Sequence, residues 1–182
     1  MFLNKEVIEF MKIKNNTYAR YISSLLLLLF LSACVAGQSS FTLGNQEFER
    51  QNYDQAVIEY LAAVESDPAN STYRIRLAEA RNNAALYHKE RGDEFVDQKQ
   101  YLSALQEYQL ATELDGSIYT ALDGIKISRD YLKVEELVKA AQALLQANQR
   151  SQAKEIVEDA LLILPDYQPA LQLKETIKKK QY

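Results

Sequence analysis

The stretch Asn52–Pro68, NYDQAVIEYLAAVESDP, decides the fold because it returns 48 residues later as QYLSALQEYQLATELDG at Gln100–Gly116. Six positions share this offset: Gly44, Tyr53, Ala56, Tyr60, Ala63 and Pro68 recur as Gly92, Tyr101, Ala104, Tyr108, Ala111 and Gly116. A weaker third copy follows at an offset of 49, with Ala141, Arg150, Ala153, Val157, Ala160 and Pro165. The chain is therefore built from internal repeats, in which stacked supersecondary units bury a continuous core.

These spacings resemble the tetratricopeptide repeat (TPR), which has small residues at positions 8, 20 and 27, aromatics at 17 and 24, and proline at 32. Asn52–Ala56 matches the family's turn into its second helix especially well. Small residues let two antiparallel helices approach, and larger ones would overpack the seam at about 1–3 kcal/mol each. The resemblance implies an all-α, TPR-like α-solenoid of antiparallel helix pairs.

The period of 48 exceeds the 34 residues of that family by about 14. At 3.6 residues per turn, the extra segment advances nearly a whole number of turns, so the old and new helix frames share nearly one face. We therefore expect two extended helices, Thr72–Lys99 and Tyr119–Gln146. An interior glycine costs about 1 kcal/mol, so the second is expected to kink or break near Gly124.

A capping helix is expected at Pro169–Lys179, because proline is tolerated in a first helical turn and solenoids need capped ends. Lys178–Lys180 then lies at its carboxyl end, where the helix dipole favours positive charge. A binding patch is the alternative interpretation of the three lysines.

A separate signal precedes the repeats. The apolar run Leu25–Leu31 follows basic residues and ends in small ones, the layout of a secretory signal. Leu31–Cys34 (LSAC) contains the only cysteine and resembles the lipobox of bacterial lipoproteins. The resemblance implies cleavage before Cys34 and its acylation, palmitate included; a buried structural cysteine is the alternative. Since Glu6 and Glu9 are unusual at such a terminus, we expect translation to start at Met11.

The expected organisation is a signal peptide at 1–33 and a lipidated cysteine with a short tether at 34–40. Helical repeats follow at 41–165, divided as 41–70, 71–116 and 117–165, with the capping helix and tail at 166–182.

Composition argues against several kinds of function. Residues 1–33 hold four basic and two acidic side chains, which leaves 17 basic and 23 acidic ones and a net charge of about −6. That sign disfavours nucleic acid, whose binding needs phosphate neutralisation. With its lone cysteine acylated, the chain would have no thiol for disulfides or metal binding. We expect no cofactor, metal or small-molecule substrate.

No catalytic residue is predicted, since no phosphate loop or nucleophile motif is present. His88, the only histidine, falls at a structural helix position. The acidic pairs Asp93-Glu94 and Glu135-Glu136 are interpreted as solvated helix faces. Tyr53, Tyr60, Tyr101 and Tyr108 are assigned to the packing seam in preference to a ligand cage.

Positions 2, 5, 9, 12 and 13 face the binding groove in the TPR family. The resemblance therefore implies groove residues Phe41, Asn45, Phe48, Glu49, Leu86, Lys89, Asp93, Val96 and Asp97. Family members that grip acidic chaperone tails use several lysines and asparagines across two repeats. Only Lys89 and Asn45 match that clamp, so this ligand is not predicted.

A lipobox followed by TPR-like repeats resembles envelope assembly lipoproteins, including secretin pilotins, and the amino-terminal module of some secretins of type II secretion and type IV pili. We expect a non-enzymatic lipoprotein of the outer membrane that faces the periplasm and scaffolds a complex such as a secretin, binding secretin or pilus components. Val35, where inner-membrane lipoproteins of enterobacteria carry aspartate, is a weak pointer to the outer membrane. The chain is either a stand-alone relative or a shortened secretin. The alternative is an accessory subunit of a peptidoglycan-remodelling or other envelope enzyme complex; an enzyme acting in its own right is a third hypothesis.

Overall fold

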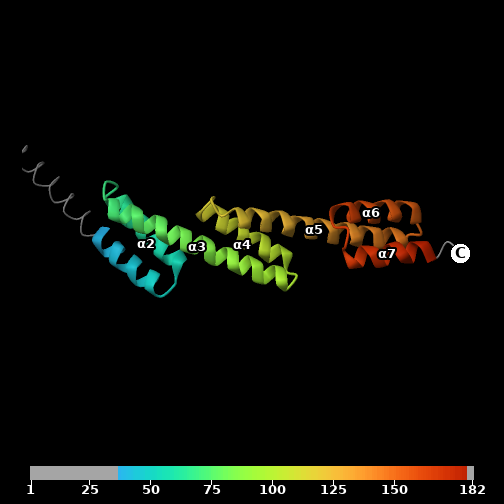
Figure 1. Ribbon diagram of the computed structural model, residues 1–182, viewed down its shortest axis with the longest axis horizontal. Helices are drawn as coiled ribbons and strands as arrows, with labels where there is room; N and C mark the ends of the chain where they lie inside the picture. Colours follow the sequence, from blue (N-terminus) through green and yellow to red (C-terminus); the bar gives the residue numbers. More distant parts are fainter. Residues whose placement is uncertain (1–36, 180–182) are drawn as a thin grey trace, which may run out of the picture. The chain divides into compact units, whose positions relative to one another are not determined.

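The computed structural model describes residues 37–179, and every regular element in that range is a helix (Figure 1). A first helical segment covers residues 37–49. After it come α2 (Tyr53–Ser66), α3 (Ser71–Asp97), α4 (Tyr101–Leu114), α5 (Tyr119–Gln146), α6 (Arg150–Ile163) and α7 (Gln168–Lys179). The expected all-α, TPR-like fold of antiparallel helix pairs is confirmed.

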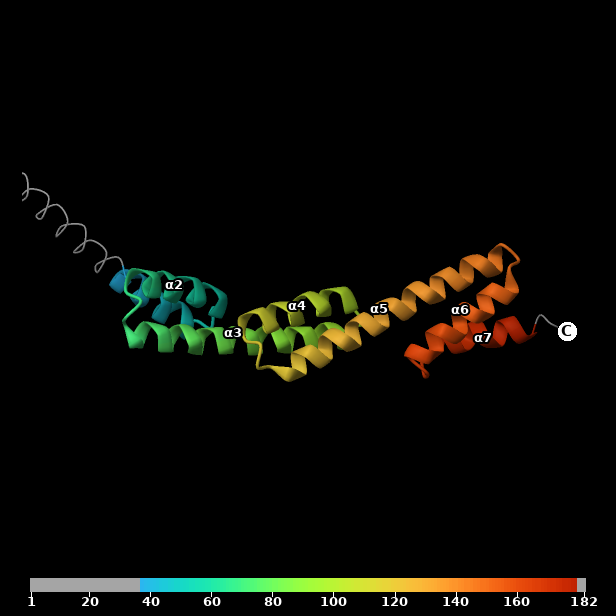
Figure 2. The same ribbon diagram turned by 90° about the horizontal axis from the view of Figure 1, so that it is seen from above.

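The chain divides into two compact units between Arg81 and Asn82, within α3. In the second unit, α5 lies beside α4 along its first half and beside α6 and α7 along its second half (Figure 2). Both expected long helices are present: α3 has 27 residues and α5 has 28. Residues 37–40, expected to form part of a tether, are helical, while the expected signal peptide, Cys34 and Lys180 lie outside the described residues.

The repeat extends to the backbone of the turns between paired helices. Gln51, Lys99 and Asn148 occupy equivalent positions and have φ angles of 62°, 58° and 63°. After each, the next amide donates to a carbonyl five residues earlier, with N···O distances of 2.9, 2.8 and 2.8 Å. This is the Schellman arrangement, which normally places glycine at the left-handed residue. Because glycine is absent here, sequence alone did not reveal that the turns are alike.

The seam between paired helices depends on glycines that face tyrosines. In the first unit, a Cβ on Gly44 would lie 2.7 Å from the Tyr60 ring. In the second, the Tyr108 ring lies between Gly92 of α3 and Gly124 of α5, where added Cβ atoms would come within 2.6 and 2.5 Å of it. The expected break near Gly124 is wrong, because α5 continues through this residue. The glycine gives room to a ring of the neighbouring helix.

The third repeat replaces the aromatic seam with aliphatic side chains. Val157 stands where the earlier repeats have tyrosine and is fully buried with Ala141, Ala153 and Ile177. Ser128 of α5 corresponds to Ala80 one repeat earlier and is equally inaccessible. Its Oγ makes no hydrogen bond with any residue of the described range. A hydroxyl therefore occupies a site suited to a methyl group.

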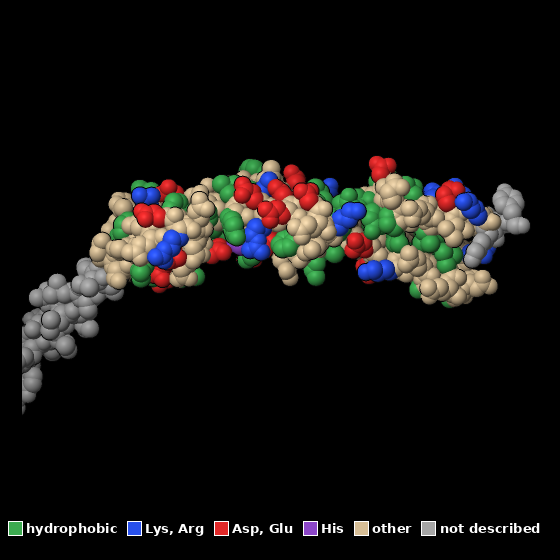
Figure 3. All heavy atoms as spheres, turned by 90° about the horizontal axis from the view of Figure 1, so that it is seen from below, with side chains coloured by type: hydrophobic (Ala, Val, Ile, Leu, Met, Phe, Trp, Pro, Cys, Tyr) green, Lys and Arg blue, Asp and Glu red, His purple; other side chains and the backbone are tan. Residues whose placement is uncertain are grey.

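Outside the seam, charged side chains share the surface with exposed apolar ones such as Leu162 and Ile75. Acidic and basic side chains are interspersed on the face drawn in Figure 3. Several form pairs within one helix turn, such as Lys133 with Glu136 at 3.1 Å and Lys178 with Glu175 at 2.7 Å. The latter pair lowers the pKa of Glu175 through the hydrogen bond and charge of Lys178. Between residues 37 and 179, no helix has the combination of length and apolar character required to span a membrane.

Gly124→Ala tests the glycine seam. Helix propensity alone favours alanine by about 1 kcal/mol, but the added Cβ would collide with a ring that Gly92 backs on its other side. We expect a net loss of about 1–3 kcal/mol in the free energy of unfolding, measured by urea denaturation. Gly116→Ala is the control, since its Cβ would have no neighbour closer than 3.8 Å. A stabilised Gly124→Ala would contradict the packing argument.

Ser128→Ala is expected to raise the free energy of unfolding by about 1 kcal/mol, because it removes a buried hydroxyl whose desolvation is uncompensated. The same urea experiment measures it. Ser151→Ala on the exposed surface of α6 is the matched control and should change stability by less than about 0.5 kcal/mol. Destabilisation by Ser128→Ala would mean that the hydroxyl has a stabilising partner.

Candidate functional site

The first unit carries a hollow of about 320 Å³ on the side where the repeat pattern places the groove. Its lining residues come from segment 37–49, α2 and the start of α3: Phe41, Asn45, Phe48, Glu49, Tyr60, Thr72 and Arg76. All four residues implied for the first repeat are among them. We call this hollow the first-unit groove.

Aromatic contacts hold the floor of the first-unit groove. Phe41 lies between Tyr60 and Tyr73, with ring centroids 5.7 and 4.8 Å away. Phe48 meets Tyr53 edge to face at 5.3 Å. Phe41 and Phe48 also pack on the buried cluster of Ala56, Tyr60 and Ala80. The floor is thus a continuation of the core.

Asn45 is oriented by the seam. The Tyr60 hydroxyl donates to its Oδ1 at 2.7 Å, and burial raises the pKa of this tyrosine, so the donor stays protonated. The amide NH₂ of Asn45 makes no hydrogen bond to another described residue. Two N–H donors of Asn45 are therefore fixed in the groove with no acceptor among residues 37–179.

The charged rim comes from Glu49 and Arg76. Arg76 pairs with Glu79 at 2.9 Å, but both side chains remain nearly half exposed. An exposed pair of this kind contributes little to stability and exchanges partners easily. The groove thus combines an apolar floor with one charge of each sign.

The residues implied for the second repeat have different roles. Asp93 accepts a hydrogen bond from Tyr108 at 2.7 Å and pairs with Lys89. Val96 packs against the core cluster around Tyr108. Leu86 and Asp97 are exposed. None of these five lines the first-unit groove, and three of them support the seam.

His88 lies where α3 contacts α4. It is buried, and its Nδ1 lies 2.7 Å from one carboxylate oxygen of Glu107. Arg91 lies 3.1 Å from the other oxygen. His88 and Arg91 of α3 thus both contact the carboxylate of Glu107 on α4.

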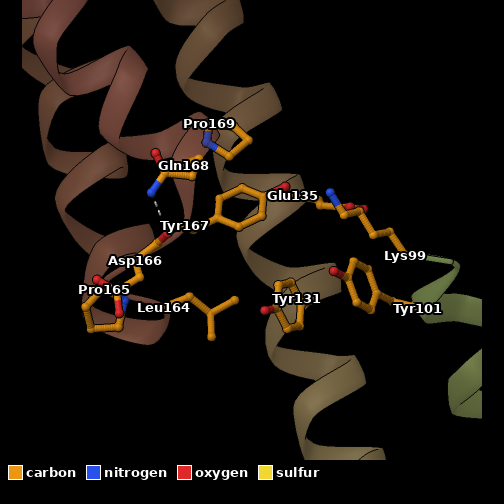
Figure 4. A pocket seen from close by; sticks show the side chains of 10 residues that line it. All are labelled: Lys99, Tyr101, Tyr131, Glu135, Leu164, Pro165, Asp166, Tyr167, Gln168 and Pro169. Atoms are coloured by element: carbon orange, nitrogen blue, oxygen red, sulfur yellow. Dashed lines mark hydrogen bonds between the residues drawn. The ribbon is translucent and has the colours of Figure 1, made fainter. Parts of the chain in front are cut away.

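A larger hollow of about 480 Å³ lies in the second unit and was missed by sequence reasoning (Figure 4). It is lined by Lys99, Tyr101, Tyr131, Glu135 and the α6–α7 turn, residues Leu164, Pro165, Asp166, Tyr167, Gln168 and Pro169. The repeat pattern predicts Tyr101 in the seam and the pair Glu135-Glu136 on a solvated face, and it does not bring these residues together. We call this hollow the tyrosine pocket.

Among residues 37–179, no group of histidine, cysteine or acidic side chains is arranged to hold a metal ion.

No protein-family model and no curated protein sequence matches the chain. Solved structures align with it along most of its length at low similarity. An Arabidopsis OM64 TPR domain has 18% identity and a TM-score of 0.26, covering 81% of this chain and 98% of its own. The first TPR of Spaghetti (RPAP3), bound to the HSP90 peptide SRMEEVD, has 19% identity and a TM-score of 0.25, covering 81% and 94%.

The second TPR domain of human RPAP3, in complex with the HSP70 peptide SGPTIEEVD, has 21% identity and a TM-score of 0.22, covering 82% and 98%. At these TM-scores the alignments do not establish a common three-dimensional arrangement. The helices, the three equivalent turns and the seam contacts of the chain itself define its fold.

The raised pKa of a seam tyrosine predicts that the fold loses stability at alkaline pH. Burial above all, then the hydrogen bond and charge of Asp93, raises the pKa of Tyr108 above its ordinary value. When a tyrosine has a higher pKa in the folded chain than in the unfolded one, the unfolded chain loses its proton first. The stabilisation from this difference is fully present below about pH 10, the ordinary pKa of tyrosine, and is lost as the pH rises above it. Above pH 10 the free energy of unfolding should fall with pH less steeply in Tyr108→Phe than in the wild type, by about 1.4 kcal/mol per pH unit.

Urea denaturation between pH 9 and pH 11.5 measures that slope. Tyr119→Phe, at a side chain that is 75% exposed, is the control and should leave it unchanged. Equal slopes for wild type and Tyr108→Phe would show that this phenol ionises as freely in the folded chain as in the unfolded one.

Proposed function

We propose that this chain is a non-enzymatic, lipid-anchored protein of the bacterial envelope that binds an extended segment of a partner protein in the first-unit groove. In this role it scaffolds assembly of an envelope complex, such as the secretin of a type II secretion or type IV pilus system. The observation that carries the proposal is the groove itself, where all four residues implied for the first repeat line one hollow.

The chemistry of the groove suits a polypeptide. Phe41 and Phe48 offer apolar rings to a side chain, and the Asn45 amide offers fixed donors to a backbone carbonyl. Binding sites of this kind combine an apolar surface with a few placed polar groups. Because the rings are already held by Tyr60, Tyr73 and Tyr53, little ordering is left to be done on binding, which favours affinity.

The anchor gives this groove a location. If Cys34 is acylated, only Val35 and Ala36 separate the lipid attachment from Gly37, where the described helix begins, so three Cα-to-Cα steps join the two. An extended chain of that length spans about 10 Å. Multiple acyl chains on one cysteine would hold the protein stably on a membrane. The groove would then meet partners embedded in or docked on the outer membrane, facing the periplasm.

Crosslinking in intact cells, followed by mass spectrometry, tests the groove and the anchor together. Thr72→Trp places an indole in the hollow without removing a core contact, and should cut recovery of the partner at least about fivefold. Ser71→Trp is the matched control, because the neighbouring residue is equally exposed and does not line the hollow. Cys34→Ala should abolish recovery by releasing the protein from the membrane.

The identity of the partner decides the complex. Recovery of a secretin or pilus subunit supports the proposal as stated. Recovery of peptidoglycan-remodelling enzymes would replace it with the accessory-subunit alternative. Undiminished recovery from Thr72→Trp would place binding elsewhere on the chain, and undiminished recovery from Cys34→Ala would remove the argument from anchoring.

A further inference from the structure

The tyrosine pocket exists because α5 is longer than a helix of a 34-residue repeat. In the second unit, the hairpin that contains α4 and the hairpin of α6 and α7 reach the middle of α5 from opposite ends. One brings Tyr101 at the start of α4, and the other brings the turn between α6 and α7. Here the extension leaves a hollow between them, over Tyr131 and Glu135 (Figure 4).

Three tyrosines form the aromatic wall. Tyr101 and Tyr131 are stacked with ring centroids 4.2 Å apart and planes 6° from parallel. Tyr167 meets Tyr131 at 6.1 Å with planes at 69°. The three rings come from three different segments, so tertiary packing fixes their mutual geometry. Faces of such rings attract cations through their quadrupole.

Glu135 adds a negative charge that is not neutralised locally. Its carboxylate is half-buried beside the rings and makes no salt bridge or hydrogen bond to another residue in the described range. Burial above all, and the charge of Glu135 as well, raises the pKa values of Tyr101 and Tyr167. The carboxylate therefore acts on both sides of the pocket.

The remaining charges leave the pocket negative. Asp166 contributes a second carboxylate from the α6–α7 turn, and Lys99 contributes one positive charge from the turn before α4. Lys99 makes no ion pair with Glu135. The net charge of the lining side chains is thus negative, which favours a cationic occupant.

We propose that the tyrosine pocket binds an arginine side chain presented by a partner polypeptide, with the guanidinium stacked on the tyrosine wall and paired with Glu135. Arginine fits better than lysine because its planar group stacks on aromatic faces and pairs with a carboxylate through two parallel hydrogen bonds. A pocket of about 480 Å³ accommodates the side chain together with neighbouring backbone. The site is separate from the first-unit groove and does not depend on the lipid anchor.

Titration of the full chain in detergent micelles with the peptide acetyl-Gly-Arg-Gly-amide tests the proposal. Tyrosine rings labelled with ¹³C report binding by NMR, and a series of single Tyr→Phe variants assigns their signals. We expect Tyr101, Tyr131 and Tyr167 to shift together along one binding curve that weakens with added salt. The citrulline peptide, which has the same shape without the charge, should bind at least about tenfold more weakly.

Matched variants locate the interaction. Glu135→Gln should weaken binding at least about threefold, whereas Glu136→Gln, at an exposed neighbour already paired with Lys133, should leave it unchanged. Tyr131→Leu should abolish the shifts, whereas Tyr119→Leu on the same helix should not. Lys99→Gln should tighten binding because it removes the opposing charge. Circular dichroism and melting temperature confirm that each variant is folded.

Three outcomes would overturn the proposal. Equal binding of the arginine and citrulline peptides would show that charge plays no part. Shifts of the same rings by chitotriose, with none by the arginine peptide, would assign the pocket to a glycan. Absence of ring shifts with the arginine peptide at millimolar concentration, in the folded wild-type chain, would exclude the site.

Discussion

The second unit depends on one close contact, the insertion of the Tyr108 ring between Gly92 and Gly124. A side chain at either glycine would push the ring out, and with it the helix on which it sits. The ring therefore sets the spacing of α3, α4 and α5 together. Its hydroxyl is fixed by Asp93, so the same residue that fills the seam also orients a polar group on the neighbouring helix. In the first unit the Tyr60 ring packs on one glycine, Gly44, and its hydroxyl is fixed in the same way by Asn45.

This arrangement explains why the two repeats offer different surfaces despite similar seams. In the first, the seam tyrosine donates to an uncharged partner, the Oδ1 of Asn45, whose NH₂ donors are available in the groove. In the second, its partner is Asp93, which Lys89 neutralises. Because Asp93 stands where the first repeat has Asn45, the second repeat has an internal ion pair where the first has an available N–H donor. Family-wide position rules treat these two residues as equivalent, and here they are not.

The repeat spacing was sufficient to predict the helix pairs and both extended helices, because each follows from periodicity along one chain. The four residues implied for the first repeat came from the resemblance to the TPR family, and the structure places them around one hollow. Gly124 was misjudged because periodicity describes only its own helix. Along α5 alone, a glycine is expected to destabilise the helix. Only the position of the Tyr108 ring shows that Gly124 leaves room for a side chain of the neighbouring helix. Tyr131, Tyr167 and Glu135 could not be grouped in advance, since they have no counterpart in the repeat pattern and meet only through packing.

The sequence by itself determined the helical class, the number and length of the helix pairs, and the seam positions, because small and aromatic residues at fixed spacing leave antiparallel helices few ways to pack. Tertiary structure alone decided what the extra helix length creates. Fourteen added residues preserve the helix face and so appear neutral in a periodic pattern. In three dimensions they separate two hairpins, and the space between them becomes a tyrosine-lined pocket.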